Sequence, residues 1–99
     1  MRRVLVQVLS QLKSSHRGRL DIIATILRST VIGARKTSIM YRCNLSFKQL
    51  EFYLGFLLRK GHLTISTKSR GNNSRFFETT EKGLGFLRAY RNLEELMSK

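Results

Sequence analysis

Apolar residues in the central part of the chain recur with helical spacing in three successive segments. They return every three or four residues in residues 20–31, which predicts an amphipathic helix. A shorter segment of the same kind follows at residues 37–43, and a longer one, capped by Ser46, reaches residue 60. Gly33 and Gly61 follow the first and third segments, and glycine is a common residue just past a helix end.

The spacing then changes to that of strands. Residues 62–67 alternate, with Leu63 and Ile65 on one side, and residues 75–78 are expected to return as a second strand. The segment between them, residues 68–74, holds glycine and asparagine, which tolerate the positive φ of a hairpin turn. The central pattern is therefore mainly α with a small β-hairpin.

The two ends of the chain are expected to be helical as well. Thr79 or Thr80 should cap a last helix that runs to about Met97. Residues 4–12 fit one helical face, but their valines also alternate as a strand would. A short helix is the preferred interpretation, and residues 13–18 are typical of a linker.

Charge points to the kind of partner. The chain has 19 lysines and arginines against six acidic residues, a net charge of +13. In residues 35–83 ten cations face three glutamates, which favours a polyanionic partner. A chain of 99 residues forms one domain with a modest core, so oligomerisation would add stability.

Cellular location is suggested by the cysteine count and by the N-terminus. Cys43 is the single cysteine, which fits a reducing cytoplasm. Arg2 and Arg3 precede a short apolar run that is similar to the start of a signal peptide, but Gln7 and Ser10 interrupt it. No segment has the length of a membrane span. We expect a soluble, cytoplasmic protein with no membrane partner.

The order of elements and several local motifs resemble a known family. Helix, short helix, turn, helix, hairpin and helix is the order of a winged helix-turn-helix. The motifs are K-T-S-I-M-Y at 36–41, N-L-S at 44–46, Y-L at 53–54, Leu57, K-G at 60–61 and T-E-K-G at 80–83. Over residues 19–97 they resemble the small archaeal winged helix-turn-helix DNA-binding proteins, which dimerise through a C-terminal helix.

This resemblance implies a division of the chain into three parts. Residues 19–83 would form the winged helix-turn-helix DNA-binding domain, and residues 84–99 the C-terminal dimerisation helix. Residues 1–18 would form a basic N-terminal extension that the resemblance does not cover.

The third helix would be the recognition helix, whose N-terminal part reaches base edges in the major groove. Ser46, Lys48, Gln49 and Phe52 point away from its apolar stripe. Glutamine can pair with adenine, and lysine with guanine or a phosphate. Glu51 could accept from cytosine, pair with a lysine or repel phosphate. The plainer alternative is a solvated helix face.

Further cations and amides are expected to hold the phosphate backbone. The first helix of a helix-turn-helix crosses that backbone, and a basic wing can lie along it or enter the minor groove. Charge that serves solubility alone is the competing interpretation. These candidates are Arg35, Lys36, Ser38, Arg42, Lys68, Arg70, Asn72, Asn73 and Arg75.

Two phenylalanines of the third helix, Phe52 and Phe56, are both expected to face outward. They could touch thymine methyl groups, pack against residues 4–12 or meet a partner chain. Packing is preferred, because aromatic side chains are more often buried than used to read bases.

The last helix carries a short coiled-coil seam. Its first apolar residues should serve the core, while Tyr90 onward should extend to a partner chain. The alternative is that the helix only covers the core. The expected dimerisation residues are Phe86, Tyr90, Leu93 and Met97, together with Leu5, Val8, Leu9 and Leu12 of the N-terminal segment.

Catalysis has little support in this sequence. His16 and His62 are far apart and have no cysteine or carboxylate at metal-ligand spacing. A reactive thiol at Cys43 is a minor hypothesis. We expect no enzymatic activity, no metal and no cofactor.

The function expected is double-stranded DNA binding by a dimer that regulates transcription. A chromosome-coating protein is the first alternative. A protein-interaction module is the second, although such a module has no need of so much positive charge. RNA binding is the third, and it lacks a sheet rich in base-stacking aromatics.

Overall fold

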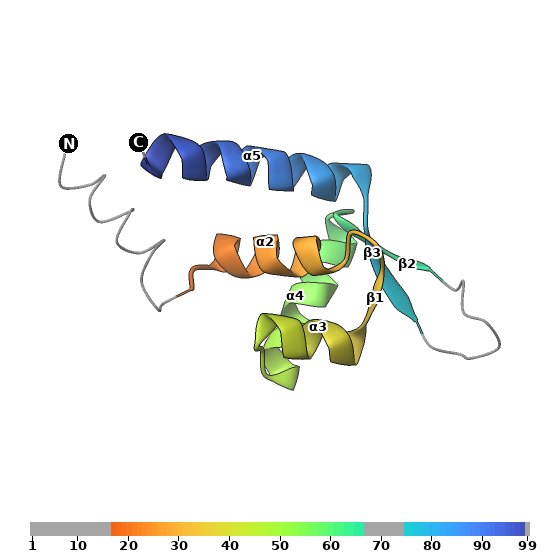
Figure 1. Ribbon diagram of the computed structural model, residues 1–99. Helices are drawn as coiled ribbons and strands as arrows, with labels where there is room; N and C mark the ends of the chain where they lie inside the picture. The colour runs from red at the N-terminus through yellow and green to blue at the C-terminus, as the bar shows by residue number, and fades with distance from the viewer. Residues whose placement is uncertain (1–16, 67–74, 99) are drawn as a thin grey trace.

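The computed structural model describes residues 17–66 and 75–98 (Figure 1). In these residues the chain forms four helices and a three-stranded sheet. Their order is α2 (Arg19–Ser29), β1 (Ala34–Arg35), α3 (Lys36–Cys43), α4 (Phe47–Arg59), β2 (Leu63–Ser66), β3 (Phe76–Thr79) and α5 (Glu81–Ser98). The mainly helical fold with a small hairpin is confirmed. The expected N-terminal helix and the tip of the wing lie outside the described residues.

Helix α2 ends earlier than predicted. Its start is fixed by Asp21, whose carboxylate accepts a 3.0 Å hydrogen bond from the backbone N–H of Gly18. Its end falls at Ser29 rather than Val31, because the Thr30 backbone leaves helical geometry at φ −111° and its N–H donates to the Leu27 carbonyl. The chain then turns through Gly33 at φ +90°, a conformation that glycine adopts without strain.

The turn between α3 and α4 follows local capping chemistry. Asn44 ends α3 in the left-handed conformation at φ 52°, which asparagine tolerates better than most residues. Leu45 is buried beneath the turn. Ser46 caps α4 as predicted, since its hydroxyl accepts from the N–H of Gln49 at 3.1 Å.

The sheet has one strand more than expected. Its order is β1-β3-β2, with both pairings antiparallel. Strand β1 has only two residues, too few to show an alternating pattern, and it is found through the pairing of Ala34 with Phe77 and of Arg35 with Phe76. This pairing joins the start of α3 to the base of the wing.

Helices α2, α3 and α4 enclose the core, and the inner face of the sheet closes it. The largest fully buried apolar side chains are Ile26, Leu27, Ile39, Leu50 and Leu57. All of them belong to the apolar stripes that the sequence predicts. Phe56 was expected to face outward, but this is wrong: the ring is half-buried and packs against the core.

Helix α5 is tied to the end of α4 by the T-E-K-G motif. Thr80, not Thr79, caps α5, since its hydroxyl accepts from the N–H of Gly83 at 3.2 Å and donates to the Gly61 carbonyl at 2.6 Å. Lys82 donates to the Lys60 carbonyl at 2.7 Å. The K-G and T-E-K-G motifs, about twenty residues apart in sequence, therefore form one contact.

Farther along, α5 lies along α2, on the side away from α3 (Figure 1). Tyr90 is 7% exposed, and its hydroxyl donates to the Asp21 carboxylate. Phe86 also packs against the core, with its ring stacked on that of Tyr90 at 6.2 Å. Tyr90 was expected to project toward a partner chain; it serves instead to hold α5 on α2. The domain boundary expected after Gly83 falls inside α5.

Candidate nucleic-acid interface

One exposed face of α4 carries an aromatic side chain between two cations. Lys48, Phe52, Gly55 and Arg59 are spaced by four, three and four residues, so they lie on one side of the helix. Buried Leu50, Tyr53, Leu54 and Leu57 form the opposite side. Phe52 is 54% exposed, which confirms that it faces outward. We call Lys48, Phe52, Gly55 and Arg59 the α4 stripe.

The N-terminus of α4 uses two predicted base-reading residues for its own capping. The N–H of Ser46 donates to Oε1 of Gln49 at 3.0 Å, and the Ser46 hydroxyl accepts in return. This reciprocal pair is a capping box. A two-point contact with adenine would use that same Gln49 oxygen together with the side-chain NH₂. Both residues are exposed at the helix end.

Lys36 is held by an acidic residue of the neighbouring helix. Its ammonium pairs with the Glu51 carboxylate and lies 4.9 Å from the centre of the Phe47 ring. Of the three possibilities left open for Glu51, pairing with a lysine is the one observed. The pair lowers the charge that Lys36 presents to a phosphate, and it joins the start of α3 to the first turns of α4.

The other candidates on and near α3 differ in exposure, since Arg35 and Arg42 are exposed and Ser38 is not. Arg42 lies in the last turn of α3, while Ser38 is half-buried. Tyr41, which the sequence did not single out, is 84% exposed on the same helix. Arg35 belongs to β1 rather than to the helix, and its guanidinium lies 5.3 Å from the ring centre of Phe76.

Arg17 contributes to this region although its sequence position suggested only a linker. Its guanidinium donates to the Cys43 carbonyl and, at 2.9 Å, to the Asn44 carbonyl. A cation at the C-terminal end of α3 satisfies carbonyls that the helix leaves unpaired. The chain before α2 is thereby fastened to the turn of the helix-turn-helix. A contact across 26 residues leaves no local signal in the sequence.

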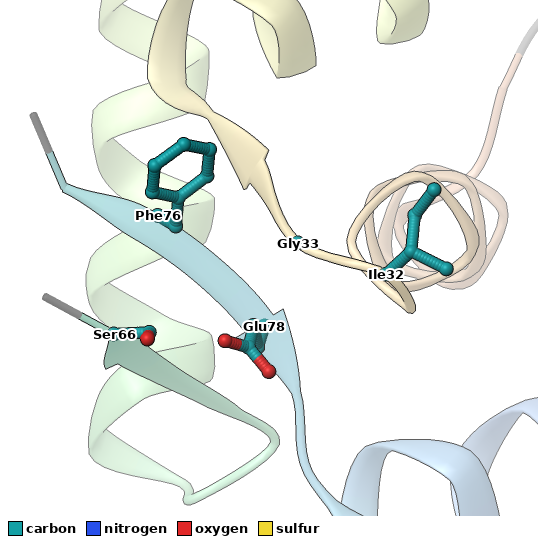
Figure 2. A pocket seen from close by; sticks show the side chains of 5 residues that line it. All are labelled: Ile32, Gly33, Ser66, Phe76 and Glu78. Carbon is teal, nitrogen blue, oxygen red and sulfur yellow. The ribbon is translucent and has the colours of Figure 1, made fainter. Parts of the chain in front are cut away.

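At the base of the wing, Arg75 is exposed just before β3. The other wing candidates, Lys68, Arg70, Asn72 and Asn73, lie outside the described residues. A hollow of about 350 Å³ lies on the outer face of the sheet. Figure 2 shows the residues that line it, Ile32, Gly33, Ser66, Phe76 and Glu78. The Glu78 carboxylate would repel phosphate there, so this face is a poor surface for DNA.

The described residues offer little for catalysis. Burial raises the pKa of the Cys43 thiol, so it stays protonated and unreactive at neutral pH. Nowhere in residues 17–66 and 75–98 do three potential metal ligands come together. None of the helices in those ranges has the length and apolar character needed to cross a membrane.

A second exposed surface lies at the far end of α5. Leu93 is 42% exposed and Leu96 is 73% exposed, and Met97 beside them is half-buried. Leu96 was absent from the predicted seam. The spacing of four, three and four residues from Phe86 selects Met97, and Leu96 lies one residue before it. The N-terminal candidates Leu5, Val8, Leu9 and Leu12 lie outside the described residues.

Comparison with known proteins places this geometry in a family. Sso10a-2, a DNA-binding protein from Sulfolobus solfataricus, is 26% identical over 83% of each chain, with a TM-score of 0.72. BpsR of Bordetella bronchiseptica, whose DNA binding is regulated by 6-hydroxynicotinic acid, is 12% identical. That match covers 97% of this chain and 72% of BpsR with a TM-score of 0.64, so it shows the fold alone.

A search of curated proteins finds no significant match. The sequence profile of the winged helix-turn-helix family, in contrast, matches residues 16–98, nearly the whole chain. This chain therefore belongs to the winged helix-turn-helix family.

Proposed function

We propose that the protein binds double-stranded DNA as a transcription regulator, with α4 in the major groove. The observation that carries the proposal is the α4 stripe, whose exposed cations lie on the helix that follows the turn. Arg42 on α3 and Arg75 at the base of the wing are further exposed cations. The similarity to Sso10a-2, itself a DNA-binding protein, supports this assignment.

A chromosome-coating protein is the second candidate. It is favoured by the capping box, which occupies the Gln49 oxygen and leaves few polar side chains on α4 free to distinguish bases. Contacts to phosphate, which supply affinity without sequence preference, would then dominate.

One salt series tests the proposal and separates the two candidates. If a dimer neutralises roughly six to ten phosphates, affinity should fall by ~10³-fold or more between 50 and 200 mM salt. A flat response would exclude this electrostatic mode of binding. Selected and random duplexes should differ in affinity for a regulator and agree for a coating protein.

We further propose that the DNA-binding form is a homodimer joined through the end of α5. Leu93 and Leu96 are apolar and exposed there, although water is an unfavourable surrounding for such side chains. Two-fold symmetry would set two α4 helices about 34 Å apart, on successive major grooves of one DNA face.

Sedimentation of Leu96→Glu and Leu93→Glu tests this interface. A charge placed in an apolar contact should convert the dimer to a monomer. The matched control is Ile32→Glu, which changes an exposed apolar residue near the sheet and should leave the dimer intact. A wild-type monomer at micromolar concentration would exclude the dimer. Dimeric variants at both leucines would place the interface elsewhere.

A further inference from the structure

Phe52 contacts a core ring from an exposed line of α4. Its ring lies edge-on to the ring of Tyr53, with centroids 5.3 Å apart and planes at 86°. Tyr53 is a buried core residue, so the core itself positions the exposed ring. A large apolar group that is fixed and left in water marks a contact surface.

Gly55, next along the stripe, has no role in folding that accounts for it. Its φ is not positive, unlike those of Gly33 and Gly61. A Cβ built on it would meet only Nη1 of Arg59, at 3.2 Å, and that atom is the far end of a flexible side chain. A glycine inside a helix lowers stability relative to alanine. Its effect here is to leave the helix surface low beside Phe52, where another molecule can approach closely.

The length of the stripe matches the major groove. From Lys48 to Arg59 the helix rises about 16 Å, at about 1.5 Å for each residue. The major groove is about 12 Å wide. With α4 set across the groove, the two cations at the ends would reach the phosphates on either side, and Phe52 and Gly55 would lie over the base edges.

The chemistry of the phenylalanine ring selects what it can cover. Most base edges in the major groove are hydrogen-bond donors or acceptors, and covering them with a ring would leave them without partners. The C5-methyl group of thymine is the one apolar group there. We propose that Phe52 contacts thymine methyl groups, so that the protein prefers duplexes that present thymine in the groove. This inference rests on the proposed function.

The direct test removes only the methyl group. Affinities are compared, at one salt concentration, for two duplexes of the same sequence that carry thymine or deoxyuridine. Each methyl that the ring covers should be worth about a fourfold difference in affinity. Phe52→Ala should bind both duplexes equally, and Phe52→Leu should keep part of the difference. Phe52 is exposed, so these variants should fold, which circular dichroism can verify.

Phe47→Ala is the matched control, since Phe47 is an exposed aromatic of the same helix that lies off the stripe against Lys36. It should keep the thymine preference. If Phe47→Ala abolishes the preference while Phe52→Ala keeps it, the assignment to Phe52 is overturned. Equal wild-type affinity for both duplexes refutes the methyl contact but leaves DNA binding intact. Binding to neither duplex refutes the proposed function itself.

Gly55→Ala tests the close approach separately. The added methyl should raise helix stability and yet reduce the thymine preference, because it lifts the helix from the groove floor. Gly85→Ala makes the same change inside α5, where a Cβ has ordinary contacts, and should leave the preference unchanged. An unchanged preference in Gly55→Ala would overturn the role given to this glycine.

Discussion

At the junction between α4 and α5 side-chain hydrogen bonds join the two helices, whereas the cations of the α4 stripe have no partner among residues 17–66 and 75–98. Thr80 alone makes three hydrogen bonds at the junction: its N–H and hydroxyl reach the His62 and Gly61 carbonyls, and its hydroxyl accepts from Gly83. On the stripe, Lys48 has no hydrogen bond or ion pair within the part of the chain that the structure describes. The junction thus serves the stability of the fold, whereas the stripe leaves its cations available for the DNA contact proposed above.

Gly83→Ala should break the junction and have the largest effect on stability. A Cβ at Gly83 would lie 2.5 Å from the His62 carbonyl oxygen and 2.5 Å from Cγ2 of Thr79. Forcing atoms into a packed site typically costs about 1–3 kcal/mol in the free energy of unfolding, which urea denaturation measures. DNA affinity of the folded fraction should stay unchanged.

Gly85→Ala is the control for that substitution. Its Cβ would meet only Nη2 of Arg88 at 3.8 Å, an ordinary contact. Removing a helix-interior glycine should therefore stabilise the protein by up to ~1 kcal/mol. Equal destabilisation by the two substitutions would mean that α5 tolerates no change, and that the close approach at Gly83 is not special.

Lys48→Ala should have the opposite effect: it should weaken DNA binding and leave the stability of the fold nearly unchanged. Removing one phosphate contact should weaken binding to all sequences and reduce the salt slope by about one for each α4 helix. The free energy of unfolding should change by no more than ~0.5 kcal/mol, since Lys48 is exposed and unpaired among the described residues. Arg88→Ala, which removes an exposed cation from α5, should leave the slope as it is. A similar loss of DNA affinity in Lys48→Ala and Arg88→Ala would show that net charge, rather than the α4 stripe, determines binding.

Ser46→Ala should lower both stability and DNA affinity, because the Ser46 hydroxyl caps the first turn of the helix that is expected to enter the groove. Loss of an N-cap typically costs about 1 kcal/mol. The Gln49 backbone N–H loses its acceptor, so the first turn of α4 should fray, and affinity for DNA should fall as well because this turn is expected to enter the groove. Ser46→Thr keeps the hydroxyl and should restore both properties. If stability falls and DNA affinity does not, the first turn of α4 is not part of the DNA interface.

The smallest effect expected is a pH dependence at the junction. Burial lowers the pKa of His62 below its ordinary value of 6.5, and the nearby charges of Lys82 and Lys60 add to the shift. The unfolded chain therefore binds a proton more readily than the folded one. The contribution of His62 to stability is complete above pH 6.5 and is lost as pH falls below it. His62→Gln should flatten this part of the stability profile, and a profile that is unchanged would show that other groups cause it.

The order of the helices, the hairpin and the cap at Ser46 could be predicted because each depends on residues a few positions apart. Helical spacing, strand alternation and capping are local properties of a chain. The T-E-K-G motif could be noticed for the same reason, although its partner at Lys60 and Gly61 could not be deduced from it.

The tertiary structure decided what depends on segments far apart. Strand β1 exists through its pairing with β3. Tyr90 is buried beside α2, where its hydroxyl donates a hydrogen bond to the carboxylate of Asp21, 69 residues away in sequence. The three-residue spacing between Tyr90 and Leu93 fits a dimer seam and a helix that covers a core equally well, so the sequence could not distinguish the two. Which of the outward-facing residues of α4 stay free, and which bond to one another, depended likewise on how α3 and α4 meet. A one-dimensional pattern shows which side chains leave a helix on the same face, but only packing determines what that face meets.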